Sequence, residues 1–266
     1  MSDARAGRPQ PADAPPTWER LALDSGLARL EARVLLERAS GHRREWLIAH
    51  GDEPADAPAA DAFAVLARRR RAGEPIAYLV GTREFRGRCF EVSPAVLIPR
   101  PETELLVRLA LERIRPGARV VDLGTGSGAI AVSLACERED LAVTATDRSP
   151  DALAIAQRNA QRLAPGALAG TRLRLREGNW WAAVGGDERF DLAASNPPYV
   201  ELGDPHLDRG DLRFEPQQAL VAGADGLAAL REIVAGAPRH LDPGAWLLLE
   251  HGCGQAAAVR ELLADA

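Results

Sequence analysis

The spacing of apolar residues changes twice along the chain, and the first part follows a helical period. From Trp18 to about Arg71 apolar positions recur every three or four residues, and one stripe consists of Leu27, Leu30, Val34 and Leu35. Gly41 and Gly73 fall where such helices should end. The pattern predicts a helical domain over residues 17–75. Residues 1–16 are rich in Pro, Ala and Asp without apolar periodicity, so they predict a disordered tail.

The second part, residues 76–98, places apolar residues between turn residues. Tyr78, Val80, Phe85, Phe90 and Val92 are spaced in this way. Such spacing is typical of a short hairpin. We therefore expect a hairpin linker over residues 76–100.

After Pro101 strand-like and helix-like segments alternate. The expected strands are residues 119–123, 142–146, 172–176, 190–194 and 245–249, and helices are expected up to Cys136, from Pro150 and near 227–234. Strands that alternate with helices of ten or more residues predict a parallel, doubly wound sheet. The expected fold class is α/β, with a Rossmann-like sheet over residues 101–266.

Composition removes several classes of protein. Hydrophobic residues make up 46% of the chain and charged residues 27%, as in ordinary globular proteins. The net charge is −5 and neither half is strongly basic, so we expect no direct binding of nucleic acid. The longest apolar runs are strand-sized, which predicts no membrane segment. Cys89, Cys136 and Cys253 lie far apart, which predicts no metal and no disulfide, and a cytoplasmic location.

The first candidate for chemistry is a glycine-rich turn between an expected strand and an expected helix. Gly124, Thr125, Gly126, Ser127 and Gly128 form this turn. Glycine lets backbone N–H groups and a helix N-terminus approach a ligand closely. The spacing of the glycines also fits dinucleotide-binding proteins, so a dinucleotide oxidoreductase remains an alternative.

Two carboxylates flank this turn. Asp122 precedes the glycines, and it would repel a pyrophosphate but attract an ammonium group, which favours S-adenosylmethionine over a dinucleotide. Asp147 ends the next expected strand, a position from which a carboxylate binds ribose hydroxyls in both cofactor classes. A cap of the following helix is the structural alternative for Asp147.

The most specific motif is Asn196-Pro197-Pro198-Tyr199, at the end of an expected buried strand. Ligands of open α/β sheets bind at the carboxyl ends of the strands. The two prolines remove N–H donors and stiffen the backbone, which leaves carbonyl acceptors in a rigid frame. Such a frame suits a substrate that carries an amino or amide group.

Methyl transfer to a planar nitrogen would explain the choice of these residues. An amide nitrogen is a poor nucleophile because its lone pair is delocalised. The Asn196 side-chain oxygen and the Pro197 carbonyl can each accept one N–H, which holds the nitrogen in line and favours the positive charge that develops on it. Tyr199 can stack on the planar group. The predicted catalytic residues are Asn196, Pro197 and Tyr199.

These segments together resemble the release-factor glutamine N5-methyltransferases of the HemK/PrmC family, from about Leu21 to Leu263. The matching segments are Gly73-Glu74-Pro75-Ile76-Ala77-Tyr78, Gly81-Thr82-Arg83-Glu84-Phe85, Ile98-Pro99-Arg100-Pro101-Glu102-Thr103-Glu104, Asp122 to Gly128, Asn196 to Tyr199, Phe214-Glu215-Pro216 and Leu249-Glu250-His251-Gly252. The Asn-Pro-Pro-Tyr motif is shared with adenine N6 methyltransferases of DNA or RNA, which remain the alternative.

The resemblance implies S-adenosylmethionine as cofactor and, as substrate, the glutamine of the Gly-Gly-Gln motif in class 1 peptide chain release factors. It implies cofactor contacts from Gly124, Thr125, Gly126, Ser127, Gly128, Asp147, Trp180 and Asn196, and substrate contacts from Asn196, Pro197, Pro198 and Tyr199. The helical domain would help to dock the release factor, and Trp180 would cover the adenine. The family often has Asp where this chain has Asn179.

Two expectations concern the remaining segments. Pro99-Arg100-Pro101, with Glu102 and Glu104, would either frame the mouth of the active site or form a stiff joint between domains. The sheet of the family normally ends in two further strands after the last helix, and this sequence ends within or just after that helix, so we expect the last two strands to be missing.

Overall fold

The computed structural model describes residues 15–266, which form two compact units divided after Val80. The predicted tail lies outside the described residues except for Pro15 and Pro16. No helix within residues 15–266 is long and apolar enough to cross a membrane.

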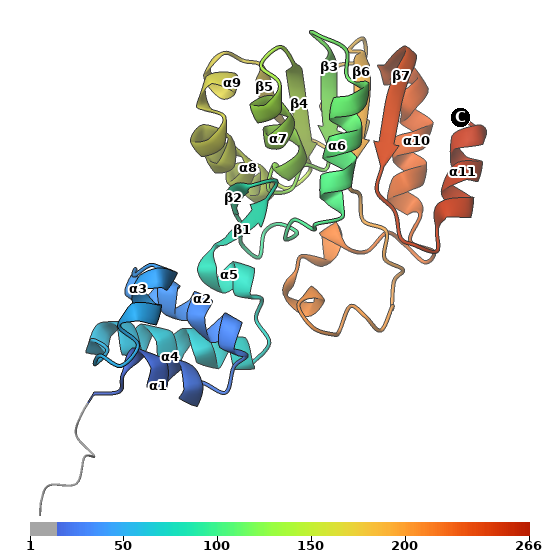
Figure 1. The fold of residues 1–266 in the computed structure, drawn as a ribbon. Coiled ribbons are helices and arrows are strands. Elements are labelled where there is room, and N and C mark those ends of the chain that lie inside the picture. The colour runs from blue at the N-terminus through green and yellow to red at the C-terminus, as the bar shows by residue number, and fades with distance from the viewer. Residues whose placement is uncertain (1–14) are drawn as a thin grey trace, which may run out of the picture. The chain divides into compact units, whose positions relative to one another are not determined.

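The first unit is helical, as its apolar period predicts (Figure 1). Its helices are α1 (Trp18–Asp24), α2 (Arg29–Ser40), α3 (Arg44–Ala49), α4 (Ala57–Arg71) and α5 (Ile76–Val80). The Asp56 side chain accepts a hydrogen bond from the Ala59 N–H and caps α4, and Gly41, with φ 72°, ends α2. Trp18, Leu35 and Phe63 lie in the core of this unit.

The predicted hairpin is shorter than the sequence suggests. Residues 76–80, for which the sequence predicts extended structure, form α5, because the Pro75 carbonyl accepts hydrogen bonds from the N–H groups of Tyr78 and Leu79. The hairpin consists of β1 (Thr82–Phe85) and β2 (Arg88–Glu91), which pair antiparallel. Helix α5 therefore belongs to the helical unit, and the hairpin to the second unit.

The second unit contains a five-stranded parallel sheet with the order β5-β4-β3-β6-β7. The strands are β3 (Arg119–Leu123), β4 (Ala142–Asp147), β5 (Leu173–Glu177), β6 (Phe190–Ser195) and β7 (Leu241–Leu249). The prediction of a parallel α/β sheet is thus confirmed. The chain builds outward from β3 to β5 and then returns to place β6 on the other side of β3, so the carboxyl ends of β3 and β6 flank the point where the strand order reverses.

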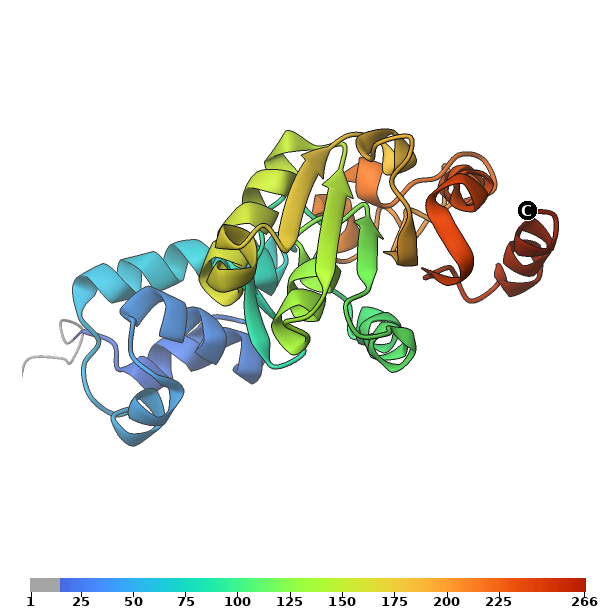
Figure 2. The ribbon, with the colours of Figure 1, turned by 90° about the horizontal axis from the view of Figure 1, so that it is seen from above.

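Helices complete the second unit and cover both faces of the sheet. They are α6 (Thr103–Arg113), α7 (Ala129–Glu137), α8 (Pro150–Leu163), α9 (Pro165–Ala169), α10 (Ala228–His240) and α11 (Ala256–Ala264), with the 3₁₀ turns η1 (Trp180–Ala183), η2 (Leu212–Phe214) and η3 (Gln217–Ala219). Figure 2 shows α11 beyond the β7 edge of the sheet.

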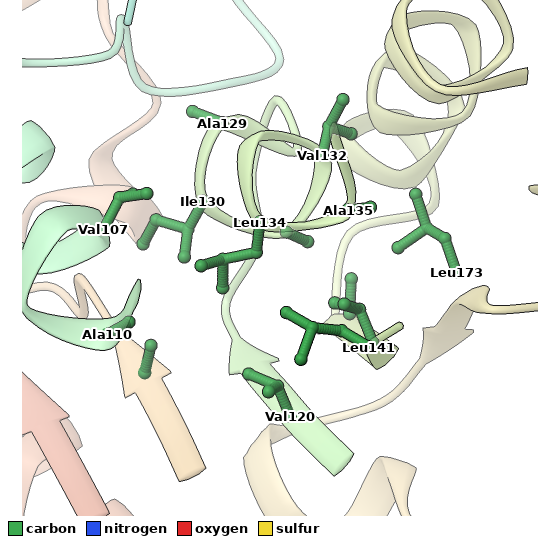
Figure 3. Close-up of a cluster of buried hydrophobic side chains, with 14 of the residues drawn as sticks. Val107, Ala110, Val120, Ala129, Ile130, Val132, Leu134, Ala135, Leu141 and Leu173 are labelled. Atoms are coloured by element: carbon green, nitrogen blue, oxygen red, sulfur yellow. The ribbon is translucent and has the colours of Figure 1, made fainter. Parts of the chain in front are cut away.

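The core of the second unit follows the alternation of strand side chains. Val120 packs on one face with residues of α6, α7 and α8, including Val107, Ile130 and Leu134 (Figure 3). Its neighbour Val121 packs on the opposite face with Trp181 and residues of α10. Successive strand residues point to opposite faces, so both faces of β3 are buried, and its residues after Arg119 are apolar except for Asp122.

Candidate active site

A cavity of about 310 Å³ lies within the second unit, at the carboxyl ends of β3, β4 and β6. It brings together eight of the residues that the sequence singles out: Gly124, Thr125, Gly126, Ser127, Asp147, Trp180, Asn196 and Pro198. Three other predicted site residues do not line it: Gly128, Pro197 and Tyr199. Gly128 instead precedes α7 and lies close to Ala156 of α8.

The glycine-rich loop is held in place largely by its own backbone. The Thr146 carbonyl accepts hydrogen bonds from the N–H groups of Gly124 (2.9 Å) and Thr125 (2.8 Å). Gly124 has φ +75°, and a Cβ at this residue would lie 2.7 Å from Cζ3 of Trp180. Only glycine fits there without moving the indole ring. The loop and Trp180 therefore form one packed wall of the cavity.

Asp147 lies at the end of β4 and binds the same loop. Its Oδ2 accepts a hydrogen bond from the Gly126 N–H (2.9 Å), and its Oδ1 accepts one from the Ser149 N–H (2.9 Å). Burial raises the pKa of this carboxyl. The cap of α8 is Ser149, whose hydroxyl accepts from the Ala152 N–H, so Asp147 does not cap that helix directly.

Asp122 supports the loop from the interior of the protein. It is fully buried, and its Oδ2 accepts hydrogen bonds from the Thr125 hydroxyl (2.6 Å) and the Ala131 N–H (3.2 Å). Its Oδ1 has no hydrogen-bond partner among the described residues. Burial raises the pKa of Asp122 to about 7. Because Asp122 does not line the cavity, its carboxylate acts on the loop.

Asn196 begins a series of hydrogen bonds that runs through Thr103, also in the cavity lining, to Glu250. Its Nδ2 donates to Oγ1 of Thr103 (3.1 Å), and the Thr103 hydroxyl donates to Oε2 of Glu250 (2.7 Å). The Tyr199 hydroxyl lies 3.5 Å from Oε1 of Glu250. Burial raises the pKa of both Glu250 and Tyr199. Three segments far apart in the sequence thus meet at Asn196.

The cavity has a second asparagine, Asn179, which is hydrogen-bonded directly to a carboxylate. Nδ2 of Asn179 donates to Oε1 of Glu232 on α10 (2.6 Å), and both residues line the cavity. Asn179 therefore has a fixed position beside Trp180.

The segment around Arg100 borders the cavity. Arg100 pairs with Glu215 (2.5 Å), whose side chain is fully buried and also accepts a hydrogen bond from the Ile98 N–H (3.1 Å). Burial raises the pKa of Glu215. Pro99 and Thr103 line the cavity, so this segment contributes to its wall.

The sequence alone assigns no individual role to Thr103, Glu215, Glu232 or Glu250. Three of them stand in segments that carry the family resemblance: Thr103, Glu215 and Glu250. Their side-chain partners are distant in the sequence: they lie at least 93 residues from Thr103 and from Glu215, and at least 51 residues from Glu250. Pairings over such distances require the folded sheet. No group of three or more His, Cys, Asp or Glu side chains suited to a metal ion occurs in residues 15–266.

The fold and the cavity define a doubly wound α/β protein with its ligand site at the carboxyl edge of the sheet. Residues 19–81 match the family model described as the PrmC N-terminal domain, and residues 101–209 match that of the methyltransferase small domain.

Relatives of known name extend these matches over most of the chain. The release factor glutamine methyltransferase of Burkholderia pseudomallei is 55% identical over 94% of this chain and 88% of the relative. That of Bordetella pertussis is 52% identical over 92% and 90%, and that of Pseudomonas aeruginosa 49% identical over 90% and 85%. The chain belongs to the family of release factor glutamine methyltransferases. Membership of this family favours methyl transfer over the dinucleotide oxidoreductase and puts the adenine N6 alternative second.

Proposed function

We propose that this enzyme transfers a methyl group from S-adenosylmethionine to the side-chain amide nitrogen of the glutamine in the Gly-Gly-Gln motif of class 1 peptide chain release factors. The reaction would take place in the cytoplasm, where these factors act. Family membership supports the reaction, and Asn196 is the observation that carries the proposal for the site. Its Nδ2 is occupied by Thr103, so its Oδ1 is left to accept an N–H from a substrate amide at the cavity.

The loop end of the cavity suits the cofactor. The proposed contacts are Gly124 to Gly128, Asp147, Trp180 and Asn196, of which all but Gly128 line the cavity. The Asp147 carboxylate would bind the ribose hydroxyls, and the Trp180 ring would cover the adenine. When bound, S-adenosylmethionine supplies an electrophilic methyl group.

The Asn196 end suits an amide substrate. The Asn196 oxygen and the Pro197 carbonyl would each accept one N–H of the substrate nitrogen, with Pro198 and Tyr199 beside the planar group. Two acceptors hold the nitrogen in line with the methyl group and favour the positive charge that develops during transfer. The first unit would help to dock the release factor.

Peptide mass spectrometry tests the proposal directly. A full-length bacterial class 1 release factor is incubated with the enzyme and methyl-labelled S-adenosylmethionine, beside the same factor with its motif glutamine replaced by glutamate, and beside duplex DNA. We expect one methyl group on the motif glutamine and none on the other two substrates. Labelled DNA with an unlabelled release factor would reverse the assignment in favour of adenine methylation.

A further inference from the structure

Four side chains form a continuous chain of polar contacts beside the cavity: Asn196, Thr103, Glu250 and Tyr199. Asn196 and Tyr199 follow β6, Glu250 follows β7, and Thr103 begins α6. Strands β6 and β7 are neighbours in the sheet, which brings their carboxyl ends together (Figure 1). Thr103 is 4% exposed, so water does not compete freely for its hydroxyl.

The Glu250 carboxylate determines which atoms donate and which accept in these hydrogen bonds. An ionised carboxylate accepts hydrogen bonds and donates none. The Thr103 hydroxyl has one proton, and at 2.7 Å it donates that proton to Oε2 of Glu250. Its oxygen can then only accept from Asn196. The Nδ2 group of Asn196 must therefore face Thr103, and the Oδ1 atom must face the other way.

From this geometry we infer that Thr103 and Glu250 are positioning residues, which hold the Asn196 amide in the one orientation that presents Oδ1 to the substrate nitrogen. The inference rests on the proposed function of Asn196. An amide turned by 180° would present its NH₂ group to the NH₂ group of the substrate. Two donors would then face each other, and neither would favour a developing positive charge.

The charge of Glu250 is the element of this chain that pH can change. The groups that face it are Thr103, Tyr199, Glu102 and Arg100, and burial is the largest cause of its raised pKa. A protonated Glu250 can donate to Thr103, which frees the threonine hydroxyl to donate to Oδ1 of a turned Asn196. The wild-type rate should therefore fall as the pH drops through the raised pKa of Glu250.

The variants Thr103→Val and Glu250→Gln remove the fixed donor–acceptor direction of these hydrogen bonds and keep the side-chain shape. Both variants should lower kcat on release factor by roughly tenfold to a hundredfold, with the Kd for S-adenosylhomocysteine within about twofold of wild type. Thr103→Ser restores the hydroxyl and should keep kcat within about threefold. Thr144→Val, at a buried threonine of β4, is the matched control and should leave kcat unchanged. Glu250→Gln should also lose the acid limb of the pH–rate profile.

Three kinetic results would overturn the inference. They are a folded Thr103→Val variant with wild-type kcat, a Thr103→Ser variant as slow as Thr103→Val, and a Glu250→Gln variant that keeps the acid limb. Melting temperatures show which variants are folded. If Thr103→Val does not fold, Thr103→Ser and Glu250→Gln decide.

A second measurement separates this inference from the proposed function. In ¹H–¹⁵N spectra of the free enzyme, the Nδ2 protons of Asn196, assigned from their loss in Asn196→Ala, should show a nuclear Overhauser contact to Thr103. The contact reports orientation without any turnover. An enzyme that shows this contact but does not methylate release factor would overturn the proposed function alone, whereas absence of the contact would overturn the orientation.

Discussion

The two ends of the cavity are built from different parts of the polypeptide. The loop end is largely backbone: residues 124–127 follow one another in the chain, and the N–H groups of Gly124, Thr125 and Gly126 are held by the end of β4. The opposite end consists of side chains from three segments, and Thr103 and Glu250 lie 147 residues apart. The loop end depends on space, whereas the other end depends on the direction of its donors and acceptors.

This difference predicts different responses to substitution. An added atom at the loop changes the space available to the cofactor, so it should alter the affinity for the cofactor. A changed hydrogen-bonding group at the Asn196 end leaves the cavity volume unchanged but alters the groups that contact the reacting nitrogen, so it should alter kcat. Separate measurements of kcat and of the Kd for S-adenosylhomocysteine distinguish the two.

The largest effect is expected at Asn196. Asn196→Ala removes the acceptor for the substrate nitrogen and should lower kcat by roughly 10²–10³-fold or more. The Kd for S-adenosylhomocysteine should rise by less than about tenfold, because the loop, Asp147 and Trp180 are unchanged. Single-turnover methylation of release factor and a calorimetric titration measure the two quantities. A rate near that of wild type would contradict the role given to Asn196.

A smaller effect is expected at Gly124. In Gly124→Ala the Cβ would lie 2.7 Å from the Trp180 ring, so the ring, which lines the cavity, must move. We expect the Kd for S-adenosylhomocysteine to rise by about tenfold, roughly 1.4 kcal/mol. The kcat at saturating substrates should change less.

Gly117→Ala is the matched control for this substitution. Gly117 has φ +73°, close to that of Gly124, but no heavy atom beyond its own chain neighbours lies within 4 Å of the position that an alanine methyl group would take there. Both variants carry the cost of a left-handed alanine, about 1 kcal/mol of folding free energy. Only Gly124→Ala should lose affinity, and equal losses of affinity in both variants would show that the Trp180 contact is irrelevant.

The same contrast explains how much can be predicted from the sequence. The strands of the sheet and the glycine loop carry their signals in consecutive residues, so β3, Gly124 and Asp147 can be placed from the sequence alone. The prediction for residues 76–80 is wrong because Tyr78 and Val80 suit a strand, while the Pro75 carbonyl organises the helical turn of α5. Local propensity there yields to backbone hydrogen bonding.

The roles of Thr103 and Glu250 cannot be predicted in this way. A threonine three residues after Arg100 and a glutamate after an apolar strand are ordinary residues in isolation. They become partners of Asn196 because β7 pairs with β6 in a fixed register, with Ser195 opposite Leu249, so that the next residues are Asn196 and Glu250. Register and strand order are properties of the folded sheet.

The smallest effect is expected for the carboxylates that support the two ends of the cavity, and it concerns folding stability. Each end has a threonine hydroxyl bound to a carboxylate, Thr125 to Asp122 at 2.6 Å and Thr103 to Glu250 at 2.7 Å. Asp122 differs because it is fully buried and its Oδ1 has no partner among the described residues, and its pKa rises to about 7. The folded state then holds a proton that the unfolded chain releases near pH 4. Folding stability from this group is therefore lost as the pH rises from about 4 to about 7, and the loss ends above the folded pKa.

Asp122→Asn should remove this dependence. Between pH 6 and pH 8 the wild-type protein should lose about 1 kcal/mol more of unfolding free energy than the variant. Native-state hydrogen exchange of the β3 amides, corrected for intrinsic rates, measures the difference within the second unit. The raised pKa values of Glu215 and Glu250 are common to both proteins and cancel in that comparison. The charge of Asp147 helps to raise the pKa of Asp122, so the difference between the two proteins includes this coupling. An equal change in both proteins would mean that Asp122 is already ionised at pH 6, and would contradict the pKa of about 7 for this carboxyl.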